Sequence, residues 1–353
     1  MSDRIDRLRR RISEEGLDAI IISQPENRRY LSGFTGSAGF LFVTASSAVL
    51  ATDFRYTEQA ERQAPDFRIH RIEGDLQRWL PQLVSAAPGK RVGFETNGVT
   101  FHTYRQLTAA VGDRELVPTD GIVECLRAIK DKHELELLTR AAEISDAAFD
   151  EVAASIRPGV TEKEVAWLME KAMRERGSES MPFDIIAASG PNAALAHHRP
   201  SERPVAEGEP LVIDMGARVD GYSSDLTRTI CLGTHDEVFG TIYRLVLQAQ
   251  RAAIDGIEAG MSGEQADALA RRVIEEGGHG EEFGHGLGHG VGLAPHEQPR
   301  LGRGSQDVLT EGMVFTVEPG IYVSGWGGVR IEDMTVLHQG RVKVLSRATK
   351  LEL

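Results

Sequence analysis

GVTEKEVAWLMEKAMRERG (159–177) and GMSGEQADALARRVIEEGG (260–278) align without a gap at an offset of 101 residues. In each segment Thr161 or Ser262 is a potential helix N-cap, with Glu or Gln three positions later. This is the capping-box pattern, in which two backbone donors at a helix start are satisfied reciprocally. Each segment follows another predicted helix and precedes a histidine-bearing stretch and an acidic hairpin. Two unrelated capped helices are the alternative, but the shared order favours a pseudo-symmetric domain with a site between its halves.

The chain before residue 120 alternates between helical and strand patterns. Helices are predicted near residues 3–15, 55–63, 75–84 and 103–112, and strands at 17–23, 67–72 and 91–95. GFLFVT and SAVLAT (39–52) predict a hairpin. A mixture of this kind indicates an α/β domain. A long helix, 131–156, begins the second pattern, so we expect one domain over 1–125 and another over 126–353.

Composition excludes several classes of protein. Of the 353 residues 41% are hydrophobic and 26% charged, which is typical of a soluble protein with a sizeable core. The net charge of −13 argues against nucleic-acid binding and against an anionic membrane surface. Two cysteines do not make a disulfide framework, and the charged N-terminal residues lack an apolar signal core. We therefore expect a cytoplasmic protein.

The first acidic hairpin is LVIDMGARVDGYSSDLTRTI (211–230). Its central Asp-Gly pair suits a two-residue turn with positive φ. Counting outward from that turn places Gly216 opposite Asp225, so Asp214 lies diagonal to Asp225 on the same face. Diagonal neighbours are roughly 7 Å apart at Cβ, and two carboxylates at that separation can converge on a metal ion.

The second acidic hairpin is MVFTVEPGIYVSGWGGVRIEDMTVL (313–337). Glu318 interrupts one apolar strand, Glu332 interrupts another, and Arg330 shares a face with Glu332. A single acidic residue in a strand is commonly an exposed edge residue. Four of them on two matching hairpins, each flanked by apolar residues, favour a shared buried site, because a buried carboxylate requires a counter-charge.

FGHGLGHGVGLAPHE (283–297) carries glycine at every second position from 284 to 292. Period two predicts an extended strand with bare backbone on one side, which allows close backbone packing. The glycine spacing fits neither phosphate-binding pattern, G-x-G-x-x-G or Walker A. A lone histidine is usually a core residue, but His285, His289 and His296, together with four acidic partners, favour metal binding or proton transfer.

These motifs resemble the pita-bread metallopeptidases, which include methionine aminopeptidase, aminopeptidase P and prolidase. The matching features are two aspartates eleven residues apart, HGLGHGVGLAPHE, TVEPGIY and VRIED. The resemblance implies a dinuclear metal site whose ligands are Asp214, Asp225, His289, Glu318 and Glu332. RRYLSGFTGSAG and TDFRYTEQA resemble the N-terminal domain of the proline-specific branch. Creatinase shares this two-domain form but works without metal and lacks the full ligand set.

The resemblance therefore implies an α+β fold with two domains. The first is a mixed α/β creatinase-like domain, and the second is a pseudo-symmetric pita-bread catalytic domain. It also implies a homodimer that hydrolyses Xaa-Pro peptides, most directly an Xaa-Pro dipeptidase. The alternatives are an Xaa-Pro aminopeptidase, which takes longer peptides, and a catalytically silent peptide-binding module.

The resemblance also implies roles for individual residues. ALAHHRP (194–200) matches the segment that carries a substrate-contacting histidine, and His197 is the matching position, although His198 beside it leaves open which imidazole points inward. His197 and His296 would stabilise the oxyanion, and Glu318 would shuttle a proton to the leaving nitrogen.

Three further positions complete the predicted site. Arg330 and Tyr322 match positions that orient the ligands and contact substrate, and His285 lines the pocket or packs in the core. Four carboxylates and one imidazole are hard donors that suit two Mn²⁺ ions, with Co²⁺ or Zn²⁺ as alternatives. Such ions lie roughly 3.5–4 Å apart and generate a nucleophile from water.

Overall fold

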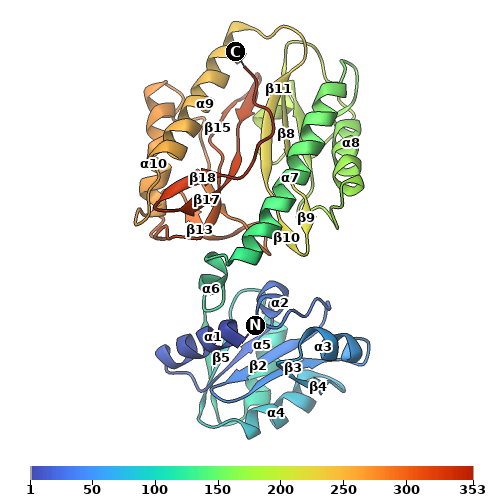
Figure 1. Cartoon of the computed structure of the whole chain (residues 1–353), viewed down its shortest axis with the longest axis vertical. Coiled ribbons are helices and arrows are strands. Elements are labelled where there is room, and N and C mark those ends of the chain that lie inside the picture. Colours follow the sequence, from blue (N-terminus) through green and yellow to red (C-terminus); the bar gives the residue numbers. More distant parts are fainter. Residues whose placement is uncertain (1, 353) are drawn as a thin grey trace. The chain divides into compact units, whose positions relative to one another are not determined.

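The computed structural model describes residues 2–352, and the chain divides into two compact units between Arg127 and Ala128. The N-terminal unit is built on one mixed sheet with the strand order β4-β3-β2-β1-β5-β6 (Figure 1). Its strands are β1 (Ala19–Ile22), β2 (Phe40–Thr44), β3 (Ala48–Thr52), β4 (Arg68–Arg71), β5 (Arg91–Glu95) and β6 (Glu115–Thr119). The predicted hairpin is confirmed, since β2 and β3 pair in antiparallel register.

The helices of this unit are α1 (Ser2–Glu14), α2 (Pro25–Ser32), α3 (Thr57–Gln63), α4 (Leu76–Ala86), α5 (Phe101–Val111) and α6 (Glu124–Ala128). The apolar side chains of α4 and α5 pack in one core with strands β1, β2, β3 and β5. The sequence patterns did not predict α2, β6 or α6. For α2 the signals were present, because Pro25 suits a first helical position and Gly33 ends the helix with φ 76°.

The second unit contains two similar halves. The first half has α7 (Lys132–Ser155) and α8 (Glu162–Glu175) with a sheet in the order β11-β8-β7 and a small ladder of β9 and β10. Their bounds are β7 (Ile186–Ser189), β8 (Pro210–Met215), β9 (Arg218–Val219), β10 (Tyr222–Ser223) and β11 (Leu226–Cys231). A short 3-10 helix, η1 (Gly190–Ala194), follows β7.

The second half has α9 (Glu237–Gly256) and α10 (Gly263–Glu276) with a sheet in the order β13-β12-β14-β17-β18 and a ladder of β15 and β16. Their bounds are β12 (Gly288–Gly290), β13 (Glu297–Leu301), β14 (Val314–Val317), β15 (Gly320–Val323), β16 (Gly327–Arg330), β17 (Asp333–His338) and β18 (Arg341–Val344). In Figure 1 the pair α9–α10 and the pair α7–α8 lie on opposite sides of the strands.

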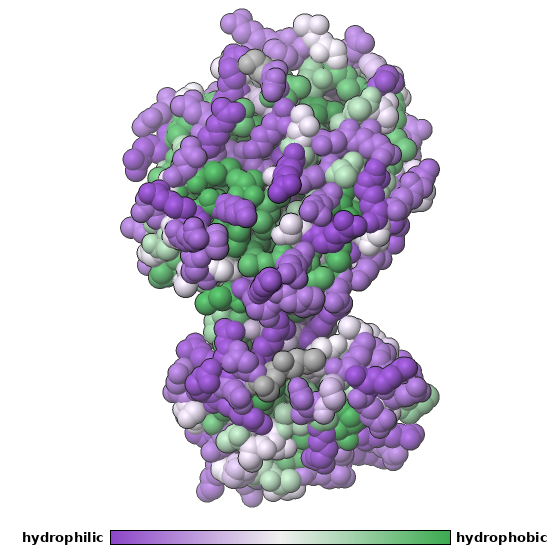
Figure 2. Space-filling model, in the orientation of Figure 1, coloured by the Kyte–Doolittle hydropathy of each residue, from purple (hydrophilic) through white to green (hydrophobic). Residues whose placement is uncertain are grey.

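The predicted pseudo-symmetry is confirmed. Thr161 and Ser262 both cap their helices with complete capping boxes. Each also forms an isolated antiparallel bridge to a later segment, to Pro204 and to Val308 respectively. Each half buries its own apolar core beneath its helix pair. Figure 2 shows hydrophilic residues over most of the visible face of this unit, with apolar residues gathered over the strands between the two helix pairs.

Candidate metal centre

The first acidic hairpin has the register predicted from its turn. Asp220 (φ 43°) and Gly221 (φ 76°) form the two-residue turn with positive φ. Asp214 in β8 pairs with Thr227 in β11, so Asp225 lies diagonal to Asp214, as counted from the sequence. The turn chemistry alone therefore brought two carboxylates to one face of the sheet.

The second acidic hairpin differs from the prediction, because Glu318 and Glu332 do not interrupt two continuous strands. They lie at a break where the β14–β17 ladder ends and the β15–β16 ladder begins. The Glu318 N–H donates to Leu287 O (2.8 Å) and the Glu332 N–H donates to Thr227 O (3.1 Å). The two acidic residues thus bond to neighbouring segments instead of to each other's strand, Glu318 to the glycine-rich segment and Glu332 to the first hairpin.

The glycine-rich segment is also shorter as a strand than its period predicts. Only Gly288–Gly290 forms a strand, because only these residues pair with β13, and Gly290 pairs with Phe315 in β14 as well. The expected close packing is confirmed. A Cβ at Gly288 would lie 2.1 Å from Thr316 O, and one at Gly290 would lie 2.1 Å from Gln298 O. His289 therefore sits on a strand that is held tightly from both sides.

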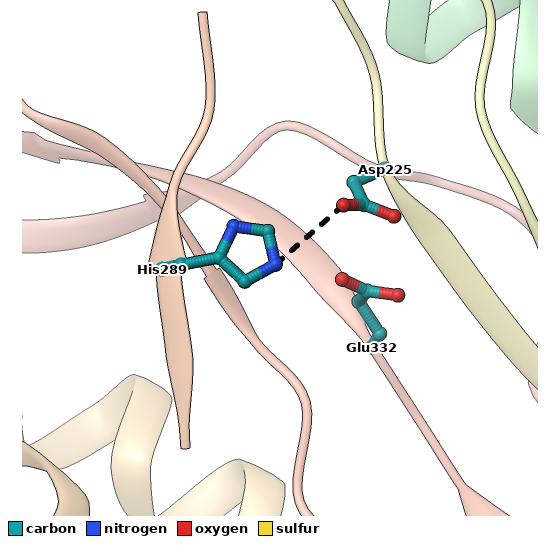
Figure 3. A group of neighbouring side chains, drawn as sticks. All are labelled: Asp225, His289 and Glu332. Atoms are coloured by element: carbon teal, nitrogen blue, oxygen red, sulfur yellow. Dashed lines mark ion pairs between the residues drawn. The ribbon is translucent and has the colours of Figure 1, made fainter. Parts of the chain in front are cut away.

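The side chains of Asp225, His289 and Glu332 converge, with one potential ligand atom of each within 4.8 Å of the others (Figure 3). His289 Nε2 lies 3.7 Å from Asp225 Oδ2 and 3.3 Å from Glu318 Oε1. Asp214 Oδ1 is buried and has no hydrogen-bond partner among the described residues. A buried carboxylate oxygen without a donor is costly, and a bound cation satisfies it.

The pKa shifts show how strongly the cluster favours added positive charge. Burial raises the pKa of Asp225, and Glu332 and Asp214 raise it further. The pKa of Glu332 is raised in the same way by burial, Glu318 and Asp214. Burial opposes protonation of His289, but Glu318 outweighs it and raises the pKa of His289 to about 9. Four carboxylates, two of them buried and two half-buried, repel one another and so fit divalent cations, which lower the cost of keeping them all ionised.

Arg330 connects the cluster to His285. Its guanidinium donates to Asp214 Oδ2 (2.6 Å) and to the Tyr322 hydroxyl (2.8 Å), and that hydroxyl lies 3.0 Å from His285 Nε2. Arg330 and His285 line a cavity of about 590 Å³, whereas Tyr322 is not among the described residues that line it. Tyr322 thus holds two residues that line the cavity, and its contact with substrate stays a prediction.

The same cavity is lined by all five predicted ligands and by His197, His198 and His296. The rings of His289 and His296 have centroids 4.0 Å apart. Burial and His289 lower the pKa of His296, and His197 adds to this lowering. His198 Nε2 instead lies 2.9 Å from Glu162 Oε2. Of the two adjacent imidazoles, His198 is thus the one that Glu162 holds, whereas His197 affects the pKa of His296.

Glu162 gives a prediction for stability against pH. Burial alone would raise its pKa, but hydrogen bonds from Ser201, Ser189, Asn192 and His198 lower it to about 2. A carboxyl with a lowered pKa contributes stability that is present above about pH 4.5 and is lost as the pH falls toward 2. We expect Glu162→Gln to lower the free energy of unfolding at pH 7 by about 3 kcal/mol. In urea titrations the difference from wild type should shrink below pH 4.5, and a constant difference would contradict this account.

Two threonines that contact the cluster were not predicted from the sequence. Thr227 donates to Glu332 Oε2 (2.6 Å), and Thr316 donates to Glu318 Oε1 (3.0 Å). Each lies two positions from an acidic residue, Thr227 after Asp225 and Thr316 before Glu318. Period two along a strand was therefore a signal that could have identified them.

Comparisons with known proteins agree with this geometry. The chain matches the model of Metallopeptidase family M24 over residues 136–339 and that of the Creatinase/Prolidase N-terminal domain over residues 4–129. An Xaa-Pro dipeptidase of Pyrococcus horikoshii is 34% identical over 352 residues, which cover 99% of this chain and 98% of that protein. The structure of an Xaa-Pro dipeptidase from Bacillus anthracis has a TM-score of 0.96 at 42% identity, covering 100% of this chain and 99% of that one. An X-Pro aminopeptidase from Thermotoga maritima has a TM-score of 0.88 at 38% identity, covering 97% and 99%.

The fold and the acidic cluster define a metallopeptidase with a pita-bread catalytic domain. The chain belongs to metallopeptidase family M24, in the branch that carries a creatinase/prolidase N-terminal domain. It is therefore a hydrolase of a family that uses divalent metal ions, and the predicted family and fold class are confirmed. Among the described residues, no helix is long and apolar enough to cross a membrane.

Proposed function

We propose that the protein is an Xaa-Pro dipeptidase, which cleaves a dipeptide and releases free proline. The observation that carries this proposal is the meeting of a complete five-residue donor set with His197 and His296 in one cavity. Relatives that span the whole chain at 34% and 42% identity are named Xaa-Pro dipeptidases, which supports the substrate class.

We assign two divalent ions, in the first instance Mn²⁺, to the predicted ligands Asp214, Asp225, His289, Glu318 and Glu332. Carboxylates and imidazole are the donors that this ion accepts, and Co²⁺ and Zn²⁺ accept them too. When bound, the ions supply Lewis acidity, which lowers the pKa of water and polarises a carbonyl group. The unpartnered Asp214 Oδ1 supports the assignment.

The remaining chemistry is assigned to the chain's own side chains. Glu318 accepts the proton released by the attacking water and passes it to the imino nitrogen of the leaving proline. His197 and His296 donate hydrogen bonds to the developing oxyanion. Arg330 holds Asp214 in orientation through the 2.6 Å ion pair. An Xaa-Pro bond has no N–H, so the site needs no acceptor at that nitrogen.

The proposal is tested by incubating the purified protein with an Xaa-Pro dipeptide and Mn²⁺. We expect free proline to appear, to disappear when a chelator is added, and to return on addition of Mn²⁺. Release of no proline with Mn²⁺, Co²⁺ or Zn²⁺ would refute the proposed function.

Xaa-Pro aminopeptidase activity is the second candidate, and the similarity to the Thermotoga maritima enzyme favours it. The two activities differ in whether the residue after proline is tolerated. A dipeptidase cleaves Xaa-Pro and rejects Xaa-Pro-Yaa, whereas an aminopeptidase cleaves the tripeptide. We expect kcat/KM for the dipeptide to exceed that for a matched tripeptide by at least about tenfold, which corresponds to about 1.4 kcal/mol.

We further propose a homodimer that acts in the cytoplasm. The resemblance to the prolidase branch supports the dimer, which light scattering measures. The presence of both cysteines, Cys125 and Cys231, as free thiols supports the reducing compartment.

A further inference from the structure

Glu162 is a buried carboxylate outside the metal cluster, and its environment is unusual for the first residue of a helix. Its side chain is 0% exposed. Oε1 accepts hydrogen bonds from Ser189 N–H (2.8 Å) and Ser189 Oγ (2.8 Å). Oε2 accepts from Ser201 N–H (3.0 Å) and Ser201 Oγ (2.6 Å). Together with Asn192 and His198, these contacts bind both ends of the segment 189–201 to one charged group.

The start of α8 does not itself require this carboxylate. Thr161 and Glu164 already complete the capping box of the helix. At the offset of 101 residues the counterpart of Glu162 in the second half is Gly263, which begins α10 behind the capping box of Ser262. A Cβ at Gly263 would lie 2.0 Å from Arg300 O, so backbone fills that space there. The fold thus forms the same capped helix without an acid at this position.

The segment that Glu162 holds contains His197. On one side of His197 the ring of His198 lies 2.9 Å from Glu162 Oε2. On the other side Ala196 O accepts a hydrogen bond from Arg330 Nη1 (3.3 Å). Both neighbours of His197 are therefore tied to buried charged groups, and this leaves little freedom for the backbone that carries its imidazole.

We propose that Glu162, acting through His198, is a positioning residue that fixes the imidazole of His197 in the active-site cavity. The proposal deepens the proposed function, on which it rests for the role of His197. Neither Glu162 nor His198 needs to touch substrate. Their contribution is that the hydrogen bond of His197 to the oxyanion is already aligned when the charge develops.

The experiment compares His198→Ala, which removes the hydrogen bond to Glu162, with His198→Gln, whose amide N–H can still reach Glu162. We expect His198→Ala to lower kcat about 10–100-fold, as is usual for partners that orient active-site groups, with KM and metal content unchanged. His198→Gln should recover most of kcat. His133→Ala, at an exposed position of α7, is the control and should behave as wild type. Melting temperatures of all variants show whether a loss of kcat merely follows a loss of folded protein.

A double-mutant cycle tests whether the effect passes through His197. In a His197→Ala background we expect His198→Ala to lower kcat little further, because the imidazole that His198 positions is absent. Additive losses would overturn the proposal, as would a His198→Ala enzyme with wild-type kcat. Crystal structures of His198→Ala and wild type give a readout without turnover: the His197 ring should leave its wild-type position, and an unmoved ring refutes the proposal. If wild type releases no proline, the proposed function fails, while this structural comparison still decides the positioning role.

Discussion

Asp225→Asn is expected to abolish hydrolysis, with kcat/KM lower by more than about 100-fold. Substitutions of groups that only orient metal ligands cost 10–100-fold, and loss of a charged ligand should cost more. Asparagine keeps the shape of Asp225 but removes one of the negative charges that converge with His289 and Glu332. Proline release and metal content, measured by emission spectroscopy, should therefore fall together.

The same substitution should make the metal-free protein more stable. In the absence of metal burial raises the pKa of Asp225, and the neighbours Glu332 and Asp214 raise it further because they repel its charged form. Each kcal/mol of relieved repulsion should raise the melting temperature by about 2–4 °C. Asp220→Asn in the turn of the same hairpin is the control, because asparagine also suits a positive φ. A near-normal rate for Asp225→Asn would remove Asp225 from the ligand set.

Gly288→Ala is expected to lower both stability and activity strongly. The new Cβ would lie 2.1 Å from Thr316 O and 2.7 Å from Thr316 Oγ1. Overpacking usually costs about 1–3 kcal/mol of folding free energy. Because the Thr316 backbone that the new Cβ meets cannot move aside easily, we expect a cost at the upper end of this range. A loss of about 3 kcal/mol lowers the melting temperature by roughly 6–12 °C. Because His289 is the next residue, we also expect activity to fall about 100-fold when the strand shifts.

Gly284→Ala is the matched control for this prediction. It lies in the same glycine-rich stretch, but a Cβ at Gly284 meets no atom within 4 Å. Its melting temperature and rate should stay close to those of wild type. Equal damage at Gly284 and Gly288 would mean that flexibility of the whole stretch, and not close packing at β12, explains the glycines.

The parts of the site that the sequence predicted correctly are those fixed by local geometry. The Asp-Gly turn determines the register of its hairpin, and the register determines that Asp214 and Asp225 share a face. The capping boxes at Thr161 and Ser262 are likewise complete within four residues of sequence. In both cases the interacting groups are neighbours along the chain, so spacing alone identifies them.

The errors concern groups whose partners are distant in sequence. The alternating glycines predicted a long strand, yet a strand exists only where neighbouring backbone pairs with it, and only Gly288–Gly290 has such partners, in β13 and at Gly290 also in β14. Glu318 and Glu332 leave their hairpin ladder because Leu287 and Thr227 accept their N–H groups. The period-two pattern of the sequence cannot show these backbone contacts, because the partners are distant along the chain.

By itself, the sequence determined the family, the two-domain α+β fold and the pseudo-symmetric order of the catalytic half. Capping residues, turn residues and motif spacing are local properties, because they depend only on residues that are close together in the sequence. Only the tertiary structure decided which of two adjacent histidines Glu162 holds, because both histidines line the cavity. The histidine that Glu162 holds is His198, 36 residues away along the chain. A buried carboxylate selects the donor that can reach it, and which donor that is depends on how the helices and strands pack.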